Sequence, residues 1–352
     1  MTANLAILAA GADAADLAAS AVRVEVCERI GEPTTYRLQF QLQEADGDFP
    51  LLADGRLGPG AELTIGTHVG EVDHVLVQGQ VHGQRLQFRH GAQDSWVEVQ
   101  GGDKAFELDR EVKAKIWSDV TVSDAISSIL SAYGVTVDVE AIATSHPEAG
   151  HTLVQRDSDL RFVRRLARRY GHWFWFSTDA AGVTTAHVKR PALAGPQAST
   201  LTINMGTPSL AELELEWDVE RPGAAIGKQV GLTDLATIDG QVARSPLTSL
   251  GTQALADVAP VRQAAIVAPV DAVGDLQARA EAALIEGGWF IRARGTTNAR
   301  ALGAVLRAHT LVAVDGLGRR HSGGYVVASV RHVIDGDGHV MDFELVRNAW
   351  EA

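Results

Sequence analysis

The feature that most constrains the fold is a repeated alternation of apolar and polar residues. It runs through residues 22–26 and 36–42 and recurs in residues 75–81, 85–89 and 96–99. A period of two places every second side chain on the same face of a strand, so each segment is expected to form a half-buried antiparallel strand. Turn residues such as Gly and Asp separate these segments at roughly ten-residue spacing. The first part of the chain is therefore predicted to be a β-barrel or β-sandwich.

A different periodicity follows, and it predicts two amphipathic helices. The first spans residues 125–134 with Gly134 as its C-terminal cap, and its apolar face includes positions 122, 126, 129, 130 and 133. The second is capped by Asp157 or Ser158 and ends at Gly171. Its apolar stripe comprises Leu160, Val163, Leu166, Ala167 and Tyr170. A hairpin is expected to follow, formed by residues 173–176 and 183–188.

Alternation resumes in the last third of the chain. It runs through residues 210–219, 311–314, 325–333 and 340–346. A helix is predicted at residues 275–286 from its Ala and Leu content. The order is thus β, then α/β, then β, and the two β regions are candidates for copies of one unit.

These patterns predict a mainly β, α+β chain with three parts. The first β domain is expected at residues 1–105, an inserted α/β domain at residues 106–195, and a second β domain at residues 196–352. Residues 232–273 are rich in Ala, Thr, Gly and Pro with little periodicity. They are expected to form an excursion or long loop within the second β domain.

Charge and cysteine content exclude several classes of protein. In 352 residues, Lys and Arg number 31 against 44 Asp and Glu, so the formal net charge is −13. This balance disfavours a surface that neutralises many phosphates, and no specific nucleic-acid binding is expected. The single cysteine, Cys27, excludes an intrachain disulfide framework and a thiolate metal cluster. Residues 1–20 lack the basic flank of a signal peptide and are interrupted by acidic residues, so neither a signal peptide nor a membrane anchor is expected.

The residues give little support for catalysis, a cofactor or a metal. The twelve histidines show no zinc-binding spacing, and no nucleophile elbow or phosphate-binding glycine loop is present. Gly316 and Gly318 share only part of a dinucleotide fingerprint and are interpreted as a hairpin turn. Glu212, Glu214 and Glu216 share one strand face, where water rather than a glycosidase cleft is expected to surround them. No catalytic, cofactor-binding or metal-binding residue is therefore predicted.

Two other features leave alternatives open. The second helix carries a basic face made of Arg161, Arg164, Arg165, Arg168 and Arg169. It either binds nucleic acid or forms a solvated or partner-facing helix side, and the acidic chain favours the second. Residues 173–176 are all aromatic and either stack on bases or sugars or pack into the core, which is favoured.

The basic helix also carries a family resemblance. The segment at residues 153–171 resembles a signature of the phage late control D family, with matches at Gln155, Ser158, Asp159, Leu160, Phe162, Leu166, Ala167 and Gly171. Further similarity covers residues 121–126 with residues 133–134, residues 322–327 with 330–332, and residues 343–348. The pieces occur in order over nearly the whole chain. This family includes tail hub proteins and the hub part of VgrG spikes.

The resemblance implies two tube-like β-barrel domains with an α/β domain inserted between them. Three subunits would then present six similar β domains in a pseudo-sixfold ring. Such a noncatalytic hub would join a hexameric tail tube, or a tube-initiator protein, to a trimeric spike beside other baseplate proteins. Because the chain stops at Ala352, the spike is expected to be a separate protein. Localisation is expected in the bacterial cytoplasm during assembly, and then in a phage tail, tailocin or extracellular injection particle.

Two rival functions remain at this stage. A tail-associated cell-wall hydrolase would need a pair of carboxylates converging in a cleft. An effector or cargo carrier at the spike is compatible with the hub. The net charge of −13 also suggests that the inner wall of such a ring is acidic and repels phosphates.

Overall fold

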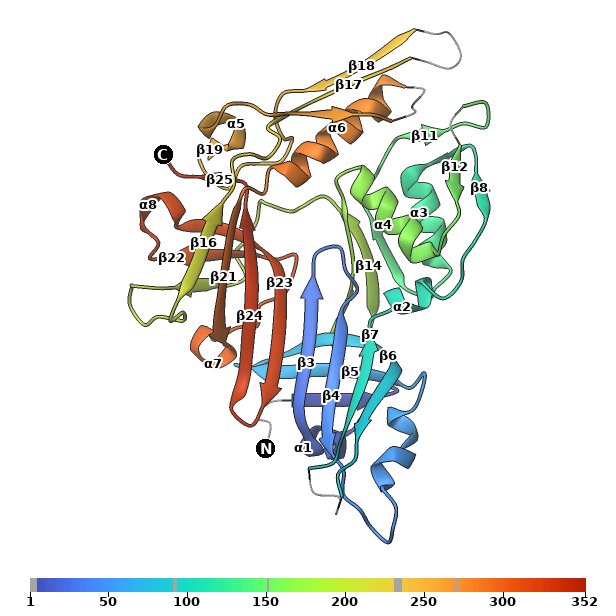
Figure 1. Cartoon of the computed structure of the whole chain (residues 1–352), viewed down its shortest axis with the longest axis vertical. Coiled ribbons are helices and arrows are strands. Elements are labelled where there is room, and N and C mark those ends of the chain that lie inside the picture. Colours follow the sequence, from blue (N-terminus) through green and yellow to red (C-terminus); the bar gives the residue numbers. More distant parts are fainter. Residues whose placement is uncertain (1–4, 91–93, 151, 231–235, 269, 271) are drawn as a thin grey trace.

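The computed structural model describes residues 5–90, 94–150, 152–230, 236–268, 270 and 272–352. Strands dominate, and helices are few and short, so the predicted mainly β, α+β fold class is confirmed. The first β region lies at the bottom of Figure 1, the α/β part at the right and the second β region at the left. None of the described helices combines the length and apolar character that crossing a membrane requires.

The first β region builds one half of a large antiparallel sheet, with the order β4-β7-β6-β5-β1-β2 outward from β3. The alternating segments at residues 22–26 and 36–42 lie in β3 and β4, as predicted. The expected strands at residues 75–81 and 85–89 fall in one long strand, β6, which ends at Gln87, two residues earlier than expected. Its register shifts between Val81 and Gly83. The elements are β1 (Leu5–Ala9), β2 (Ala12–Asp13), α1 (Ala15–Ser20), β3 (Ala21–Arg29), β4 (Thr35–Gln41), η1 (Pro50–Ala53), η2 (Gly55–Leu57), β5 (Glu62–Val69), β6 (Val72–Gln87) and β7 (Trp96–Gly102).

The α/β part follows and has a core of its own. Both predicted helices are present, as α3 and α4, and the predicted hairpin is β13–β14. β14 also pairs in parallel with β10. The elements are α2 (Ala105–Leu108), β8 (Lys115–Trp117), β9 (Val120–Thr121), α3 (Val122–Ser131), β10 (Thr136–Val139), β11 (Ser145–His146), β12 (Leu153–Gln155), α4 (Asp159–Arg169), β13 (Trp173–Thr178) and β14 (Thr184–Lys189).

The second β region completes the sheet through β23, which pairs with β24 on one side and with β3 on the other. The sheet continues from β24 to β21 and ends at β16, and β22 with β15 branches from β23. The elements are β15 (Thr200–Thr202), β16 (Leu213–Trp217), β17 (Ala224–Val230), β18 (Thr237–Val242), β19 (Gln253–Ala254), α5 (Leu255–Val258), β20 (Gln263–Ile266), α6 (Val273–Gly287), β21 (Ile291–Asn298), α7 (Ala299–Leu302), β22 (Leu311–Asp315), α8 (Gly318–His321), β23 (Gly323–Asp335), β24 (Gly338–Arg347) and β25 (Ala349–Trp350).

One apolar core joins the two β regions. It contains Leu38 and Phe40 from β4 together with Val330 from β23 and Phe343 from β24. Because the same cluster draws on both ends of the chain, the two regions are packed as one body. The domain boundaries given above stay a prediction.

The segment at residues 232–273 differs from the expectation of a long loop. Where it is described, it contributes β18 and β20, which flank β17 in a three-stranded sheet at the top of Figure 1. Gly227 of β17 lies opposite Gly240 of β18, and the side chain of Leu276 from α6 covers both. A Cβ atom at either glycine would come within 2.8 Å of Leu276. Glycines in these strands obscured the alternation, because they allow a close helix contact and contribute no apolar side chain.

The connection that contains Gly316 and Gly318 also differs in detail. It joins the paired strands β22 and β23, but it includes the helical turn α8 and is longer than a tight hairpin turn. Gly316 has a φ of +92°, and a Cβ atom there would overlap the carbonyl oxygen of Ile203. The glycine is thus required by backbone packing.

Arg347 anchors the carboxyl end of β24. Its side chain is fully buried, and its guanidinium donates to the carbonyl oxygens of Leu250, His321 and Ser322 at 2.6 to 3.2 Å. Gly323 approaches the same guanidinium so closely that a Cβ atom would lie 3.0 Å from it. This contact gives a structural reason for two pieces of the resemblance, those at residues 322–327 and 343–348.

The solvent-facing side of the large sheet carries both signs of charge. Ion pairs cross neighbouring strands there: Arg23–Asp335, Arg331–Glu25, Arg331–Asp342, Arg292–Glu344 and Arg294–Glu216. This face is therefore mixed in charge rather than acidic, although the chain as a whole is acidic.

Candidate functional site

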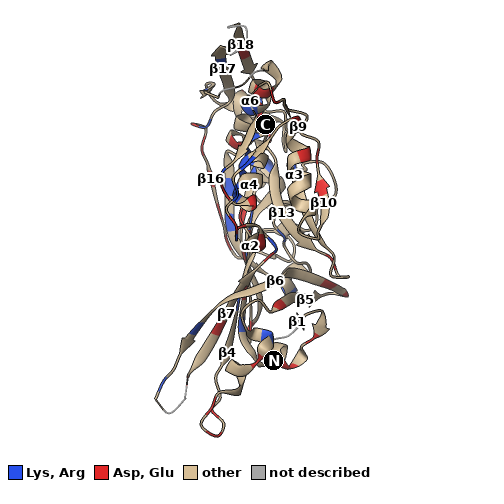
Figure 2. Ribbon diagram, turned by 90° about the vertical axis from the view of Figure 1, so that its right-hand side faces the viewer, with Lys and Arg blue, Asp and Glu red and all other residues tan. Residues whose placement is uncertain are grey.

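The basic helix face predicted from the sequence lines a cleft of about 950 Å³. The cleft lies between α4, the β3–β4 turn at Ile30 to Glu32, and the carboxyl end of α6. Figure 2 shows basic residues gathered around α4, in the middle of the long molecule. We call this feature the arginine cleft.

All five arginines predicted on the helix face line the arginine cleft, and three of them form ion pairs. Arg161 lies 3.4 Å from Asp109, Arg165 pairs with Asp157, and Arg168 pairs with Glu286 of α6 at 2.5 Å. This helix side is thus partly paired with carboxylates of its own chain, and a solvated or partner-facing role for the rest of it stays a prediction. The Arg168–Glu286 pair is well exposed on both sides, so it stabilises the fold by only about 0–1 kcal/mol.

Three more arginines reach the cleft from distant segments, and no pattern in the sequence indicates that they lie near α4. Arg279 pairs with Asp275 along α6, and Arg292 of β21 pairs with Glu344. Arg221 donates to the carbonyl oxygens of Gly287 and Glu286. Folding therefore brings further arginines, from α6, β21 and the segment before β17, beside α4.

Positive charge exceeds negative charge in the cleft. Eight arginines line it, and the carboxylates that line it or pair with these arginines number six: Glu32, Glu286, Asp109, Asp157, Asp275 and Glu344. Burial and the neighbouring Arg279 lower the pKa of Arg169, and burial and Arg292 lower that of Arg221. Within the described part of the chain, Arg164 and Arg169 have no hydrogen-bonded or ion-paired side-chain partner.

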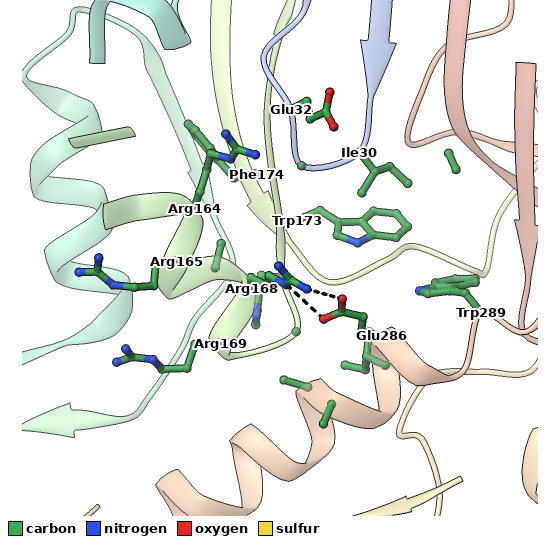
Figure 3. Close-up of a pocket in the computed structure, with 18 of the residues that line it drawn as sticks. Ile30, Glu32, Arg164, Arg165, Arg168, Arg169, Trp173, Phe174, Glu286 and Trp289 are labelled. Carbon is green, nitrogen blue, oxygen red and sulfur yellow. Dashed lines mark hydrogen bonds and ion pairs between the residues drawn. The ribbon is translucent and has the colours of Figure 1, made fainter. Parts of the chain in front are cut away.

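On the side of the cleft that faces the β3–β4 turn, Arg164 is the arginine without a side-chain partner among the described residues. In Figure 3, Arg164 points toward the turn and Arg168 toward α6, whereas Arg165 and Arg169 point the other way. Glu32 lies across from Arg164, and its only ion pair in the described residues is a 3.9 Å contact with Arg29. The guanidinium of Arg164 is thus available to a ligand.

The aromatic run beside α4 is packed, as favoured from the sequence. Phe174 and Phe176 are buried in the core of the α/β part. Trp173 borders the cleft, with the ring of Trp289 5.8 Å away on one side and His309 5.5 Å away on another. Both neighbours cover the Trp173 ring, so stacking on a nucleobase or sugar is disfavoured.

The position of α4 is fixed at its start by a buried polar network. Ser158 is the N-cap and accepts from the backbone N–H of Arg161. Asp159 is buried and accepts from Lys113, Tyr133 and Gln155 at 2.5 to 2.7 Å. Burial opposes ionisation of Asp159, but these donors outweigh it and lower its pKa. The polar residues Gln155, Ser158 and Asp159 are thus structural supports of the helix that carries the arginines.

The end of α4 is fixed by a glycine against α6. Gly171 has a φ of +73°, and a Cβ atom there would lie 2.6 Å from the side chain of Ile285. Tyr170 donates from its hydroxyl to Asp275 of α6 at 2.9 Å. These contacts set the distance between the two helices that flank the cleft.

A second polar cluster lies on the face of the β10–β14–β13 sheet that is turned away from α3 and α4, toward the second β region. Ser177 Oγ is 2.8 Å from His187 Nε2, and His187 Nδ1 is 2.9 Å from Asp138 Oδ2. The order of groups matches a nucleophile, a base and an orienting acid. However, Asp138 also binds Lys189 at 2.6 Å, and His187 stacks on Trp175, which in turn stacks on His309. None of the three residues lines a described cleft, so we interpret the cluster as packing between the sheet and the second β region.

The acidic strand face is placed where the sequence indicated, on β16 and the residue before it. Glu212, Glu214 and Glu216 are exposed. Glu212 and Glu214 line a shallow cleft with Asp342 and Arg294, but Asp342 already accepts from Thr296 at 2.8 Å and pairs with Arg331. Such an open, ion-paired site lacks the burial that raises the pKa of one carboxyl for general acid catalysis.

No cluster of three or more His, Cys, Asp or Glu side chains suited to a metal ion is found among the described residues. Cys27 lies exposed on β3. The prediction that the chain has no metal-binding, cofactor-binding or catalytic residues stays a prediction.

When the sequence is compared with models of protein families, one family matches. The family described as "Alg8 N-terminal domain" matches residues 2–336, nearly the whole chain. The chain belongs to this family. The description of the family names a domain and no activity. No curated protein matches the chain in sequence.

Solved structures with the same fold come from phage tails and a secretion system. The 43 kDa tail protein of prophage MuSo2 from Shewanella oneidensis has a TM-score of 0.66 at 14% identity, with 98% of each chain covered. A tail protein from Neisseria meningitidis MC58 has a TM-score of 0.68 at 14% identity, covering 98% of this chain and 96% of that one. An Escherichia coli component of the type VI secretion system has a TM-score of 0.58 at 14% identity, covering 93% and 73%. This member of the Alg8 N-terminal domain family therefore has the fold of these tail proteins.

Proposed function

We propose that this chain is the structural baseplate hub of a contractile phage tail or phage-tail-like injection particle. In this proposal three copies form a ring that joins a hexameric tail tube to a trimeric spike. The observation that carries it is the pairing of β3 with β23, which joins the two β regions side by side in one sheet. The shared fold with two tail proteins, one of them from a prophage, over 98% of this chain supports it, as does the resemblance to the phage late control D family.

The proposal rests on matching symmetries. If the two β regions are copies of one unit, as the sequence analysis expects, each chain presents two similar surfaces and three chains present six. One face of such a pseudo-sixfold ring would match the sixfold symmetry of a hexameric tube, and the other face would match the threefold symmetry of a spike. The domain division predicted from the sequence, with the α/β part inserted between two tube-like β domains, belongs to this proposal.

The edge of the large sheet supports ring formation. Among the described strands, β16 pairs only with β21, so its other edge has backbone groups free to pair. In the ring, this edge would continue the sheet into the next copy. Because β16 and its neighbours carry exposed charges rather than a broad apolar face, the pairing would depend on backbone hydrogen bonds and ion pairs.

The acidic inner wall suggested by the net charge stays a prediction, and it depends on which face of the large sheet lines the ring. If the solvent-facing side of the large sheet turns inward, the lumen is lined by paired charges of both signs. The carboxylates beside these arginines repel phosphates, so passage of a polyanion does not require a net acidic wall.

The role we propose is noncatalytic, with the tube or a tube-initiator protein, a separate spike protein and other baseplate proteins as partners. The chain would assemble in the bacterial cytoplasm and remain in the finished particle. Neither a cell-wall hydrolase nor an effector carrier is favoured by a specific contact in the described residues.

Imaging of particles tests this proposal. The chain, tagged and expressed with its neighbouring genes, should appear in averaged images as a single ring at the junction between tube and spike. Its absence from purified particles, with tube and spike present, would overturn the proposal.

A further inference from the structure

We propose that the arginine cleft binds an extended, carboxylate-rich segment of a partner polypeptide, with Arg164 and Arg168 as its main contacts. This site is independent of the hub assignment, because it is defined by the charge and shape of a cleft within one chain.

The first argument is the uncompensated charge. Arg164 has no ion-paired or hydrogen-bonded side-chain partner in the described residues, and arginines in and around the cleft outnumber carboxylates by eight to six. The chain has a net charge of −13, so a cleft with an excess of positive charge differs in sign from the protein as a whole. Anionic groups are therefore attracted to this cleft against the overall field of the protein.

The second argument is the chemistry already present. Carboxylates of this chain pair with Arg161, Arg165 and Arg168, so the cleft is built for contacts between guanidinium and carboxylate groups. The Arg168–Glu286 pair is exposed, with 76% of the arginine and 56% of the glutamate side chain accessible. Exchange of Glu286 for an incoming carboxylate would thus cost little.

The third argument is spacing. Arg161, Arg164 and Arg168 follow each other by three and four residues along α4, so neighbouring side chains emerge about 5–6 Å apart. Alternate residues of an extended chain lie about 6–7 Å apart on one side. A segment with acidic residues at every second position therefore matches this row of arginines.

The aromatic residues favour a polypeptide over nucleic acid. Among the described residues that line the cleft, Trp173 is the only tryptophan that is not buried, and the rings of Trp289 and His309 pack against its ring. Single-stranded nucleic acids gain much of their affinity from stacking on open aromatic faces. The described lining of the cleft offers phosphate contacts but no such platform.

Fluorescence anisotropy with the full chain tests the proposal. The probe is a fluorescein-labelled decapeptide of alternating Glu and Ser, and the comparison probes are a Lys-Ser decapeptide and a thymidine hexanucleotide with five phosphates. The glutamate peptide should bind, its affinity should fall with added salt, and the two comparison probes should bind at least tenfold more weakly. Competition by inorganic phosphate should require a much higher concentration than competition by the unlabelled peptide.

Two substitutions with opposite expected effects separate binding from misfolding. Arg164→Glu should weaken binding of the glutamate peptide at least tenfold. Glu286→Gln releases Arg168 and should strengthen binding severalfold, which damage to the fold would not do. The matched control is Arg319→Glu, which makes the same charge change at an exposed residue of α8 outside the cleft.

Three results would overturn the proposal. These are the absence of binding to the wild-type chain, an equal loss with Arg319→Glu and Arg164→Glu, and tighter binding of the hexanucleotide than of the peptide. The last result would assign the cleft to nucleic acid. Because the assay uses the isolated chain, its failure leaves the hub proposal untouched, and failure to find the chain in particles leaves this assay valid.

Discussion

Arg307 and Glu28 form an ion pair across the two β regions, with the Nε of the arginine 2.6 Å from a carboxylate oxygen of the glutamate. Glu28 is buried on β3, and its second oxygen accepts from the backbone N–H of Ala308. Arg307 also donates to the carbonyl oxygens of Val75 and Leu76 on β6. The pair thus fastens the loop before β22 to two strands of the first β region, beside the place where β3 meets β23.

Replacing Arg307 with Ala should destabilise the chain by about 3–5 kcal/mol, because Glu28 would be left as a buried, unpaired charge. Urea unfolding measures the change. Arg319→Ala, at an exposed residue of α8, should change stability by no more than about 0.5 kcal/mol. Equal stability of the Arg307→Ala variant and the wild type would show that the ion pair does not fasten the two regions.

Gly171→Ala should destabilise the chain by about 3 kcal/mol or more. The substitution combines an unfavourable positive φ with a clash against Ile285 of α6. Gly134→Ala is the matched control, because Gly134 has a similar φ of +67° but no atom within 4 Å of its expected Cβ position. That variant should lose only about 1 kcal/mol. Similar losses of stability in both variants would mean that α4 and α6 can accommodate a methyl group at residue 171, which contradicts the prediction.

Arg347→Lys should destabilise the chain by about 2–4 kcal/mol even though it keeps the charge. Lysine lacks the planar fork that reaches the carbonyl oxygens of Leu250, His321 and Ser322, so buried acceptors would lose their donors. Thermal unfolding of the two proteins provides the measurement. A lysine variant as stable as the wild type would contradict the assignment of these hydrogen bonds as the anchor of β24.

Acid should weaken the fold through two buried histidines. His332 and His339 contact each other at 3.0 Å between ring nitrogens. Burial and His339 lower the pKa of His332 well below 6.5, and burial, with a contribution from His74, lowers that of His339 to about 4. The unfolded chain takes up these protons near pH 6.5, whereas the folded chain does so only at lower pH. The contribution of the two histidines to the free energy of unfolding is therefore fully present above pH 6.5 and is lost as the pH falls from about 6.5 toward 4. The loss from His339 alone should reach roughly 2–3 kcal/mol.

Nuclear magnetic resonance of the imidazole nitrogens tests this directly. Both rings should remain neutral at pH 5.5 in the folded chain. Urea unfolding at pH 7.5 and 5.0 should show a smaller pH dependence in His339→Leu than in the wild type. That comparison is needed because burial raises the pKa of Asp103 to about 6, which opposes the histidines over the same range. Protonation of either ring near pH 6.5 would contradict the prediction.

Much of the fold could be predicted from local patterns. Alternation in residues 36–42 identified β4, because one face of that strand is buried and the other is not. The apolar stripe from Leu160 to Tyr170 identified α4, since all of its members pack into one core. Such patterns depend only on neighbours along the chain, and the structure preserves them.

Contacts between distant segments could not be predicted in this way. Nothing near Arg221, Arg279 or Arg292 in the sequence indicates that folding brings them beside α4. Glu28 and Arg307 are 279 residues apart in the sequence. Taken separately, each would be predicted to be an ordinary exposed charged residue. The strands β17 and β18 were missed for a related reason. The need for glycine at positions 227 and 240 becomes visible only in the fold, where the side chain of Leu276 lies against both.

The most direct test of the central claim is the mass of the purified chain in solution, measured by light scattering over a range of concentrations. The account predicts a discrete species of three times 37.4 kDa, present alone or in exchange with the single chain at micromolar concentration. A mass of one chain that does not change up to the highest concentration reached, also in the presence of tube and spike proteins, would contradict it.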